Sequence, residues 1–280
     1  MLNMQGKIIK IISNTFTVDV DGELFETKAR GKFRNDKITP MVGDLVAIDA
    51  ENLLITDIFP RKNELKRPFI SNIDKAFIIT SVTEPKLSFD LLDKQLALIN
   101  YNNIDPVVVL TKIDLLTSSE VKELKKIIKY YSNIGIKTLK NTEKRKLKKT
   151  ICKNTVVFTG QSGAGKSTLL NRLDKMLDLK TSPISKSLGR GKHTTRHVEL
   201  FEIAGGLVAD TPGFSSLELS ELTIEDLKHV FVEFKHYSCE FSDCNHLKEK
   251  NCGVKQNVEQ GKILESRYKN YVKFVGELKK

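Results

Sequence analysis

The sequence predicts a multidomain protein with three parts: an N-terminal OB-like β-barrel, a central α/β domain with a phosphate-binding loop, and a C-terminal helical module that binds zinc. Short strands separated by turn residues predict the barrel. Buried strands that alternate with amphipathic helices predict the α/β domain. Four metal-binding side chains in a polar, helical segment predict the zinc module. We expect these parts to cover residues 1–65, 66–220 and 221–280.

The charge of the chain favours an anionic partner. Its 280 residues have a formal net charge of +11, and nucleic acid is the commonest partner of so basic a protein. A merely basic, solvated surface is the alternative. No signal peptide is recognisable and no apolar run approaches the ~20 residues that span a bilayer. We therefore expect a cytoplasmic protein that does not engage a membrane.

Residues 1–65 carry the pattern of a small closed barrel. An apolar run at 8–12 is followed by alternating residues at 16–20 and by Asp21 and Gly22, a strong hairpin signal. Further strands are expected after residue 44 and after residue 52, each preceded by turn residues. Short strands this closely spaced suit an OB-type barrel, with an SH3-like barrel as the alternative.

One basic loop is a candidate RNA contact, and a second basic segment is a candidate for a binding role. The loop at 28–34 places four cations and the aromatic Phe33 on what should be an exposed connection, which suits phosphate contacts and base stacking. The segment at 140–149 is also strongly basic. For both segments a solvated basic surface is the alternative, and for 140–149 the two interpretations have equal weight.

The middle of the chain predicts a mainly parallel sheet covered by helices on both faces. After a basic linker at 61–68, strands are expected at 76–79, 106–110 and 156–158, and helices at 89–101 and 121–130.

A complete phosphate-binding loop follows the strand at 156–158. It matches G-x-x-x-x-G-K-[ST], and the residues expected to bind nucleotide are Gly160, Gln161, Ser162, Gly163, Ala164, Gly165, Lys166, Ser167 and Thr168. Glycines let backbone N–H groups close around phosphates, and the helix N-terminus adds a positive dipole. We expect Lys166 to reach the β- and γ-phosphates and Ser167 to bind Mg²⁺.

Thr111, Lys112 and Asp114 form a guanine-recognition loop directly after a buried strand, at the end where α/β sheets bind ligands. Asp114 is suited to accept hydrogen bonds from the guanine N1–H and amino group, a pattern that adenine lacks. Lys112 is suited to pack over the base. Thr111 stands where Asn is usual. The loop favours GTP over ATP as the substrate.

The loop Asp210-Thr211-Pro212-Gly213 follows another strand-like segment. Asp210 is expected to hold Mg²⁺, and the Gly213 N–H to meet the γ-phosphate. In Ras-like enzymes the next residue is a Gln that orients the attacking water. Here it is Phe214, which does not hydrogen-bond to water. Another residue or a partner must therefore position the nucleophile.

The segment at 189–197 lies where the first switch of a GTPase belongs. Either Thr194 or Thr195 can cap Mg²⁺ and the γ-phosphate. His193 is a candidate for orienting water, because its imidazole titrates near neutrality. The alternative is that His193 and His197 are ordinary polar loop residues.

These loops run in an unusual order. The guanine loop precedes the phosphate loop, and the Asp210 loop comes last, whereas an ordinary small GTPase begins with its phosphate loop. The order predicts a circularly permuted P-loop GTPase, in which the chain leaves the switch loops directly into the C-terminal module.

Three of the four cysteines cluster with a histidine near the C-terminus. Together Cys239, Cys244, His246 and Cys252 offer a full tetrahedral set for structural Zn²⁺. His229 and His236 are expected to be bystanders, and Cys152 a small buried hydrophobe without a role. A terminal helix is expected to place Ile263, Tyr271, Phe274 and Val275 on one face, and Lys262, Arg267, Lys269 and Lys273 on the other.

The motif order, Phe214 after the Asp210 loop, and the trailing Cys/Cys/His/Cys set together resemble the bacterial ribosome small-subunit-dependent GTPase A (RsgA) family over nearly the whole chain. The resemblance implies a role in late maturation of the small ribosomal subunit, with hydrolysis stimulated by that subunit and tied to release from it. It also implies that the barrel and the zinc module bind ribosomal RNA.

Three features depart from the pattern. Arg196 stands where the first switch often carries a third Thr, and the fifth guanine-site motif near 140–142 is degenerate. Gly163 stands where potassium-activated GTPases often carry Asn, so we expect no potassium dependence of that type.

The sequence therefore predicts a monomeric GTPase that binds the small ribosomal subunit and its rRNA and hydrolyses GTP slowly on its own. A GTP-gated rRNA-binding factor, in which hydrolysis is incidental, is the alternative. Asp210 and Thr194 argue against it, because a pure binder need not retain a magnesium site. An ATP-dependent RNA enzyme is a third hypothesis, which Asp114 argues against.

Overall fold

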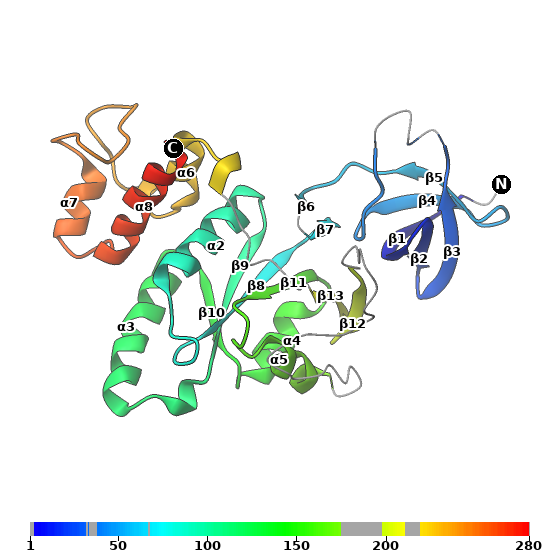
Figure 1. The fold of residues 1–280 in the computed structure, drawn as a ribbon, viewed down its shortest axis with the longest axis horizontal. Coiled ribbons are helices and arrows are strands. Elements are labelled where there is room, and N and C mark those ends of the chain that lie inside the picture. Colours follow the sequence, from blue (N-terminus) through cyan, green and yellow to red (C-terminus); the bar gives the residue numbers. More distant parts are fainter. Residues whose placement is uncertain are drawn as a thin grey trace, which may run out of the picture.

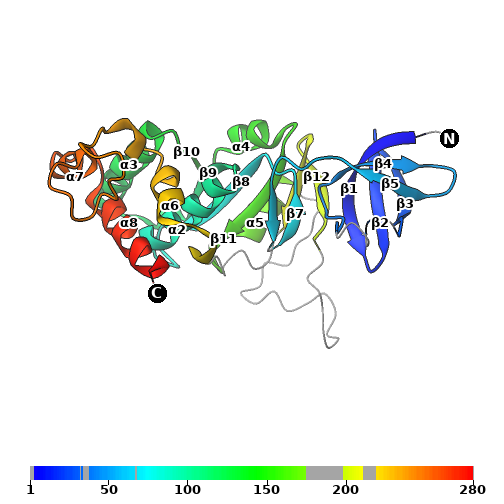
Figure 2. The same ribbon diagram turned by 90° about the horizontal axis from the view of Figure 1, so that it is seen from above.

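The computed structural model describes residues 3–31, 33, 38–66, 68–174, 198–210 and 219–279, with Asn3 and Asp210 described by their backbone alone. Figures 1 and 2 show a β-barrel at one end, an α/β domain in the middle and a helical module that contains the C-terminus at the other end. The multidomain fold class predicted from the sequence is confirmed.

The barrel is closed by five strands in the order β1-β2-β3-β5-β4, because β1 also pairs with β4. Its strands are β1 (Asn3–Ile12), β2 (Thr15–Val20), β3 (Glu23–Ala29), β4 (Leu45–Asp49) and β5 (Leu54–Ile58). Asp21 and Gly22 both have positive φ, at 51° and 93°, as a two-residue hairpin turn requires. The Gly22 N–H also donates to Asp19 Oδ1 at 2.8 Å.

The expected stacking residue of the barrel loop is instead part of the barrel core. Phe33 is only 4% exposed and packs with Ile8, Val18 and Val46, so the interpretation of its ring as a base-stacking platform is wrong. Burying the ring removes apolar area from water, which outweighs its position in a basic segment. Lys28, at the end of β3, and Arg30, just after it, are exposed.

The α/β domain is built on a six-stranded sheet in the order β10-β9-β8-β11-β13-β12. All neighbours are parallel except β12 and β13. The strands are β8 (Lys75–Ser81), β9 (Asp105–Thr111), β10 (Lys137–Lys140), β11 (Thr155–Gly160), β12 (Leu200–Ile203) and β13 (Gly206–Asp210).

Helices cover both faces of this sheet, as predicted. They are α2 (Phe89–Tyr101) and α3 (Ser118–Asn133) on one face, α4 (Lys144–Ile151) and α5 (Lys166–Leu173) on the other, and the short η1 (Ile113–Leu115). Ile78 of β8 packs on the side of α2, whereas Phe77 and Ile79 pack on the side of α4 and α5, which is the alternation of a strand. Cys152, just after α4, is exposed, so the prediction that it is buried is wrong.

Residues 61–66 and 68 of the expected linker have a defined structure. They enter a hairpin of β6 (Glu64–Lys66) and β7 (Phe69–Ser71). Arg61 holds the hairpin to the barrel, because its Nε and Nη2 donate to the buried Asp44 carboxylate at 2.7 and 2.8 Å. The barrel also contacts the chain just before β12, where Lys10 pairs with Glu199 at 2.8 Å.

The C-terminal module shares its core with the α/β domain. Its elements are η3 (Leu219–Glu221), α6 (Ile224–Val230), η4 (Phe234–His236), α7 (Gly253–Glu259) and α8 (Glu265–Leu278). Leu98 of α2 lies in the same apolar cluster as Leu227 and Phe274. None of the helices within the described ranges is long and apolar enough to cross a membrane.

One cation on α8 is not on the solvated face that the sequence predicted. Arg267 is 1% exposed, and its Nη1 donates to Asp93 of α2 at 2.7 Å. Its Nε and Nη2 donate to Glu233 at 2.7 and 3.0 Å, and Tyr131 donates to Asp93 at 2.8 Å. Burial opposes ionisation of Glu233, but the guanidinium outweighs it and holds the pKa of Glu233 below its ordinary value.

This buried pairing makes Arg267 a strong determinant of stability. Arg267→Met leaves the Asp93 and Glu233 carboxylates buried without a cation, and we expect it to destabilise the protein by about 3–5 kcal/mol in urea unfolding. The control is Lys269→Met on the same helix, whose pair with Glu265 is exposed, so little change is expected. Equal unfolding midpoints for the two variants would contradict this account.

Candidate nucleotide site and metal centre

The phosphate-binding loop connects the end of β11 to the start of α5. Gly160, Gly163 and Gly165 have φ values of +146°, +79° and +91°, a region that favours glycine. A Cβ on Gly160 would lie 2.1 Å from the Ile79 carbonyl oxygen of β8. The loop therefore passes β8 at a distance that only glycine permits, and Lys166 begins α5 directly after it.

The guanine loop contacts the phosphate loop. Thr111 is 2% exposed and its Oγ1 donates to the Ala164 carbonyl oxygen at 2.6 Å. Lys112 has a left-handed φ of +59°, and its Nζ donates to the Glu84 carbonyl oxygen. Asp114 is exposed in η1. Thr111, which replaces the usual Asn, thus ties two loops that lie 53 residues apart in sequence.

Asp210 lies at the same edge of the sheet. Its backbone is in register with Phe158 of β11, two residues before Gly160. Because parallel strands end at one edge, the ends of β9, β11 and β13 converge there. Ser167 and Thr168 follow in the first turn of α5. His193, Thr194, Thr195, Gly213 and Phe214 lie outside the described residues.

The structure adds Gln95 to the residues near the phosphate loop. A cavity of about 390 Å³ is lined by Pro85, Leu91, Gln95, Gly160, Gln161 and Ser162. Gln95 is 3% exposed, and its Nε2 donates to Thr159 Oγ1 at 3.4 Å. The sequence gives only a weak signal for Gln95, which is a polar residue directly before the apolar position Leu96 of a helix.

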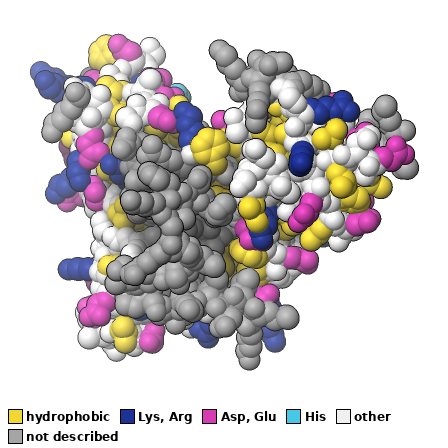
Figure 3. Space-filling model, turned by 45° about the vertical axis from the view of Figure 1, so that its right-hand side comes forward, with side chains coloured by type: hydrophobic (Ala, Val, Ile, Leu, Met, Phe, Trp, Pro, Cys, Tyr) yellow, Lys and Arg dark blue, Asp and Glu magenta, His cyan; other side chains and the backbone are white. Residues whose placement is uncertain are grey.

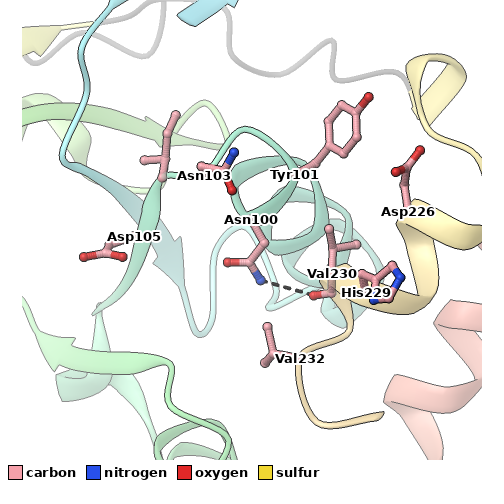
Figure 4. A pocket seen from close by; sticks show the side chains of 9 residues that line it. Asn100, Tyr101, Asn103, Asp105, Asp226, His229, Val230 and Val232 are labelled. Carbon is pink, nitrogen blue, oxygen red and sulfur yellow. Dashed lines mark hydrogen bonds between the residues drawn. The ribbon is translucent and has the colours of Figure 1, made fainter. Parts of the chain in front are cut away.

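A larger cavity, of about 570 Å³, lies where α2 and the start of β9 meet α6 (Figure 4). Its polar groups already have structural partners. Asn100 donates to the Val230 carbonyl oxygen at 3.2 Å, and Asp105 pairs with Lys75 at 2.9 Å. It adjoins the first residues of β9 rather than the carboxyl end where Thr111 lies. This cavity is therefore separate from the nucleotide loops.

The four predicted metal ligands converge in the C-terminal module. The ligand atoms of Cys239, Cys244, His246 and Cys252 all lie within 4.8 Å of one another. The His246 Nδ1 is 3.3–3.5 Å from the three sulfurs, and the sulfurs of Cys239 and Cys252 are 3.8 Å apart. A tetrahedral zinc ion with Zn–S bonds of about 2.3 Å requires sulfurs about 3.8 Å apart. The cluster can hold zinc.

The surroundings of His246 fix this geometry. Its backbone is left-handed, with φ +56°, and its carbonyl oxygen accepts a hydrogen bond from the Tyr268 hydroxyl at 2.7 Å. The ring packs edge-on against Phe234. Burial, aided by Lys228, lowers the pKa of His246, which favours the neutral imidazole that a metal ion needs.

Comparison with known sequences identifies the family. The model of the RsgA GTPase domain matches residues 58–220, and that of the RsgA N-terminal domain matches residues 5–54. The chain belongs to the RsgA GTPase family. It is therefore a GTP hydrolase, and membership of the RsgA family implies GTP and Mg²⁺ at the nucleotide loops.

Full-length relatives agree with this assignment. Proteins named small ribosomal subunit biogenesis GTPase RsgA from Staphylococcus haemolyticus and Enterococcus faecalis are each 44% identical to the chain. The similarity covers 98% and 99% of this chain and 97% and 96% of theirs.

Two solved structures share the fold. YjeQ from Thermotoga maritima superposes with a TM-score of 0.86 at 35% identity, over 99% of both chains. YloQ, described as a circularly permuted GTPase, superposes with a TM-score of 0.85 at 38% identity, over 99% of this chain and 95% of that one. The permuted order predicted from the sequence is confirmed.

The Thr111 hydroxyl should support nucleotide affinity. Thr111→Val removes the donor and leaves the Ala164 carbonyl unpaired, so we expect GTP and GDP to bind about 5- to 30-fold more weakly, or about 1–2 kcal/mol. Thr111→Ser retains the hydroxyl and should bind close to wild type. Titration with a fluorescent guanine nucleotide measures both, and wild-type affinity in the Val variant would refute the role of this bond.

The cysteine cluster should bind zinc. We expect purified protein to contain about one zinc ion per chain by elemental analysis, and Cys244→Ser to lose most of it and to make the C-terminal module sensitive to protease. Cys152→Ser is the matched control, because Cys152 lies outside the cluster, and it should retain full zinc content. Retention of zinc by Cys244→Ser would exclude the proposed ligand set.

Proposed function

We propose that this protein is a GTPase of late small-ribosomal-subunit assembly, which hydrolyses GTP to GDP and phosphate when it is docked on the subunit. The observation that carries the proposal is the 2.6 Å bond from Thr111 to Ala164. It joins the guanine and phosphate loops of a chain that resembles, from end to end, relatives named small ribosomal subunit biogenesis GTPases.

Each loop binds a different part of the nucleotide. Asp114 and Lys112 select guanine, and the phosphate-loop amides and Lys166 surround the β- and γ-phosphates. Mg²⁺ held by Ser167 and Asp210 supplies further positive charge to the phosphates. The Gly213 N–H, with Thr194 or Thr195, contacts the γ-phosphate. Charge that develops there during hydrolysis is thus met by groups already in place.

The chain does not have the Gln that usually orients the attacking water at this position. Phe214 occupies that position, so hydrolysis by the free protein is slow. His193 orients the water, and docking on the subunit brings His193 into reach of the nucleotide. This division of labour couples GTP hydrolysis to the presence of the correct partner.

The flanking parts hold the RNA. The exposed Lys28 and Arg30 of the barrel and the zinc-stabilised module contact ribosomal RNA, one on each side of the GTPase domain. The three parts correspond to residues 1–65, 66–220 and 221–280. The protein acts as a monomer in the cytoplasm, where the subunits are assembled.

GTP hydrolysis with purified small subunits tests this proposal. We expect the subunits to raise the wild-type rate at least tenfold. His193→Ala should lose about 100-fold or more of the stimulated rate, as removal of a water-positioning group does. Lys166→Ala should lose hydrolysis with and without subunits but still co-sediment with them.

An equal rate with and without subunits would exclude the coupled mechanism. Normal subunit binding and assembly by a variant without hydrolysis would instead support a GTP-gated binding factor. ATP that competes as well as GTP for the site would exclude the role assigned to Asp114.

A further inference from the structure

Helix α4 carries a positive outer face that the nucleotide chemistry does not use. Residues 137–153 contain eight Lys and Arg residues and one acid, Glu143. Leu147, Thr150 and Ile151 are buried against the sheet, whereas Lys144, Arg145, Lys146 and Lys149 are exposed and Lys148 is half-buried. Figure 2 shows α4 on the outside of the α/β domain, between the barrel and the C-terminal helices along the long axis.

These cations are largely unpaired. Within the described parts of the chain, the one ion pair formed by the Lys and Arg residues of 137–153 joins Lys146 to Glu143. On α8, by contrast, Lys269 pairs with Glu265 and Lys273 with Asp90. The face shown in Figure 3 likewise has cations and acids interspersed. The single-sign face of α4 thus differs from α8 and from the face in Figure 3.

The stability of the helix does not explain these cations. Lys144 and Lys148, and likewise Arg145 and Lys149, are like charges four residues apart, an arrangement that destabilises a helix. Lys144 and Arg145 also lie in the first turn, where the helix dipole disfavours positive charge. The N-cap, Glu143, makes no side-chain capping bond there. A cationic face that destabilises its own helix in these ways indicates an anionic partner.

The positive field extends beyond the helix. Lys137, at the start of β10, donates from Nζ to Thr150 Oγ1 of α4 at 2.7 Å. Burial lowers the pKa of Lys137, and the nearby charges of Lys75 and Lys149 lower it further. Lys137 of β10 and Lys149 of α4 therefore lie close enough to repel one another, whereas Lys75 of β8 also pairs with Asp105 at 2.9 Å.

We propose that the α4 surface, formed by Lys144, Arg145, Lys148 and Lys149, binds the phosphate backbone of ribosomal RNA. This adds an RNA contact on the GTPase domain itself, and it rests on the proposed function for the identity of the RNA. The other exposed cations of 137–153 extend the same field.

The chemistry of the α4 surface favours an RNA backbone over a protein. None of the exposed large hydrophobic residues in the described chain lies on α4, whereas protein interfaces are built around an apolar core. The surface also lacks an aromatic ring on which a single-stranded base could stack. Cations alone, on a rigid helix, suit the phosphates of a folded RNA.

Charge removal tests this proposal with a matched control. The α4 variant replaces Lys144, Arg145, Lys148 and Lys149 with Gln. The α3 control replaces four exposed lysines on the opposite face of the sheet, Lys122, Lys125, Lys126 and Lys129, also with Gln. Gln is a good helix former, and loss of the repulsions should leave the melting temperature of the α4 variant at or above that of wild type. Intrinsic GTP hydrolysis should be unchanged in both.

Binding is measured against small subunits and against a protein-free RNA duplex of about 20 base pairs, over a range of salt concentrations. For the α4 variant we expect affinity for both to fall on the order of tenfold, and the slope of log K against log salt to become about 3.6 less steep, because each of the four lost phosphate contacts contributes about 0.9. The α3 control should match wild type.

The outcomes separate this inference from the proposed function. Wild-type binding and salt slope in the α4 variant would refute the α4 surface and leave the proposed function intact. Loss of subunit binding with unchanged duplex binding would mean that α4 meets a ribosomal protein, and the proposal would be wrong. If the wild type binds the duplex through α4 but does not bind small subunits, the RNA contact would be supported and the ribosomal role refuted.

Discussion

The nucleotide site depends on the parallel pairing of β8 with β9 on one side and β11 on the other. This pairing places the guanine loop and the phosphate loop at one edge of the sheet although the chain visits them in permuted order. It also brings the backbone of Gly160 so near the Ile79 carbonyl that no Cβ fits between them. The Thr111 bond to Ala164 then sets the spacing between the two loops.

Helix α2 connects the nucleotide site to the C-terminal module. Gln95 contacts Thr159 beside the phosphate loop, and Asp93, two residues earlier, receives the buried Arg267 of α8. Leu98 adds to the apolar core of the module. One helix thus contacts both the strand that leads into the phosphate loop and the helix that packs beside the metal ligands, so the two functional regions share a rigid element.

Sequence patterns gave correct predictions where a local conformation accepts only a few residue types. Asp21 and Gly22 form the expected turn, because few residues tolerate two successive positive φ values. Patterns failed where burial depends on distant partners. The spacing places Arg267 on the polar face of its helix, yet its side chain is buried because it pairs with Asp93 and Glu233. Phe33 lies in a basic loop but fills the barrel, and Cys152 is exposed because α4 ends before it.

The sequence by itself determined the family, the order of the nucleotide loops and the four residues of the Cys/His cluster that could hold zinc, because glycine backbones, guanine recognition and thiolate coordination each require particular residues at particular spacings. Only the tertiary structure decided which residues connect those elements. The Thr111 bond, the position of Gln95 and the buried Arg267 all depend on segments that are distant in sequence and meet only in the folded chain.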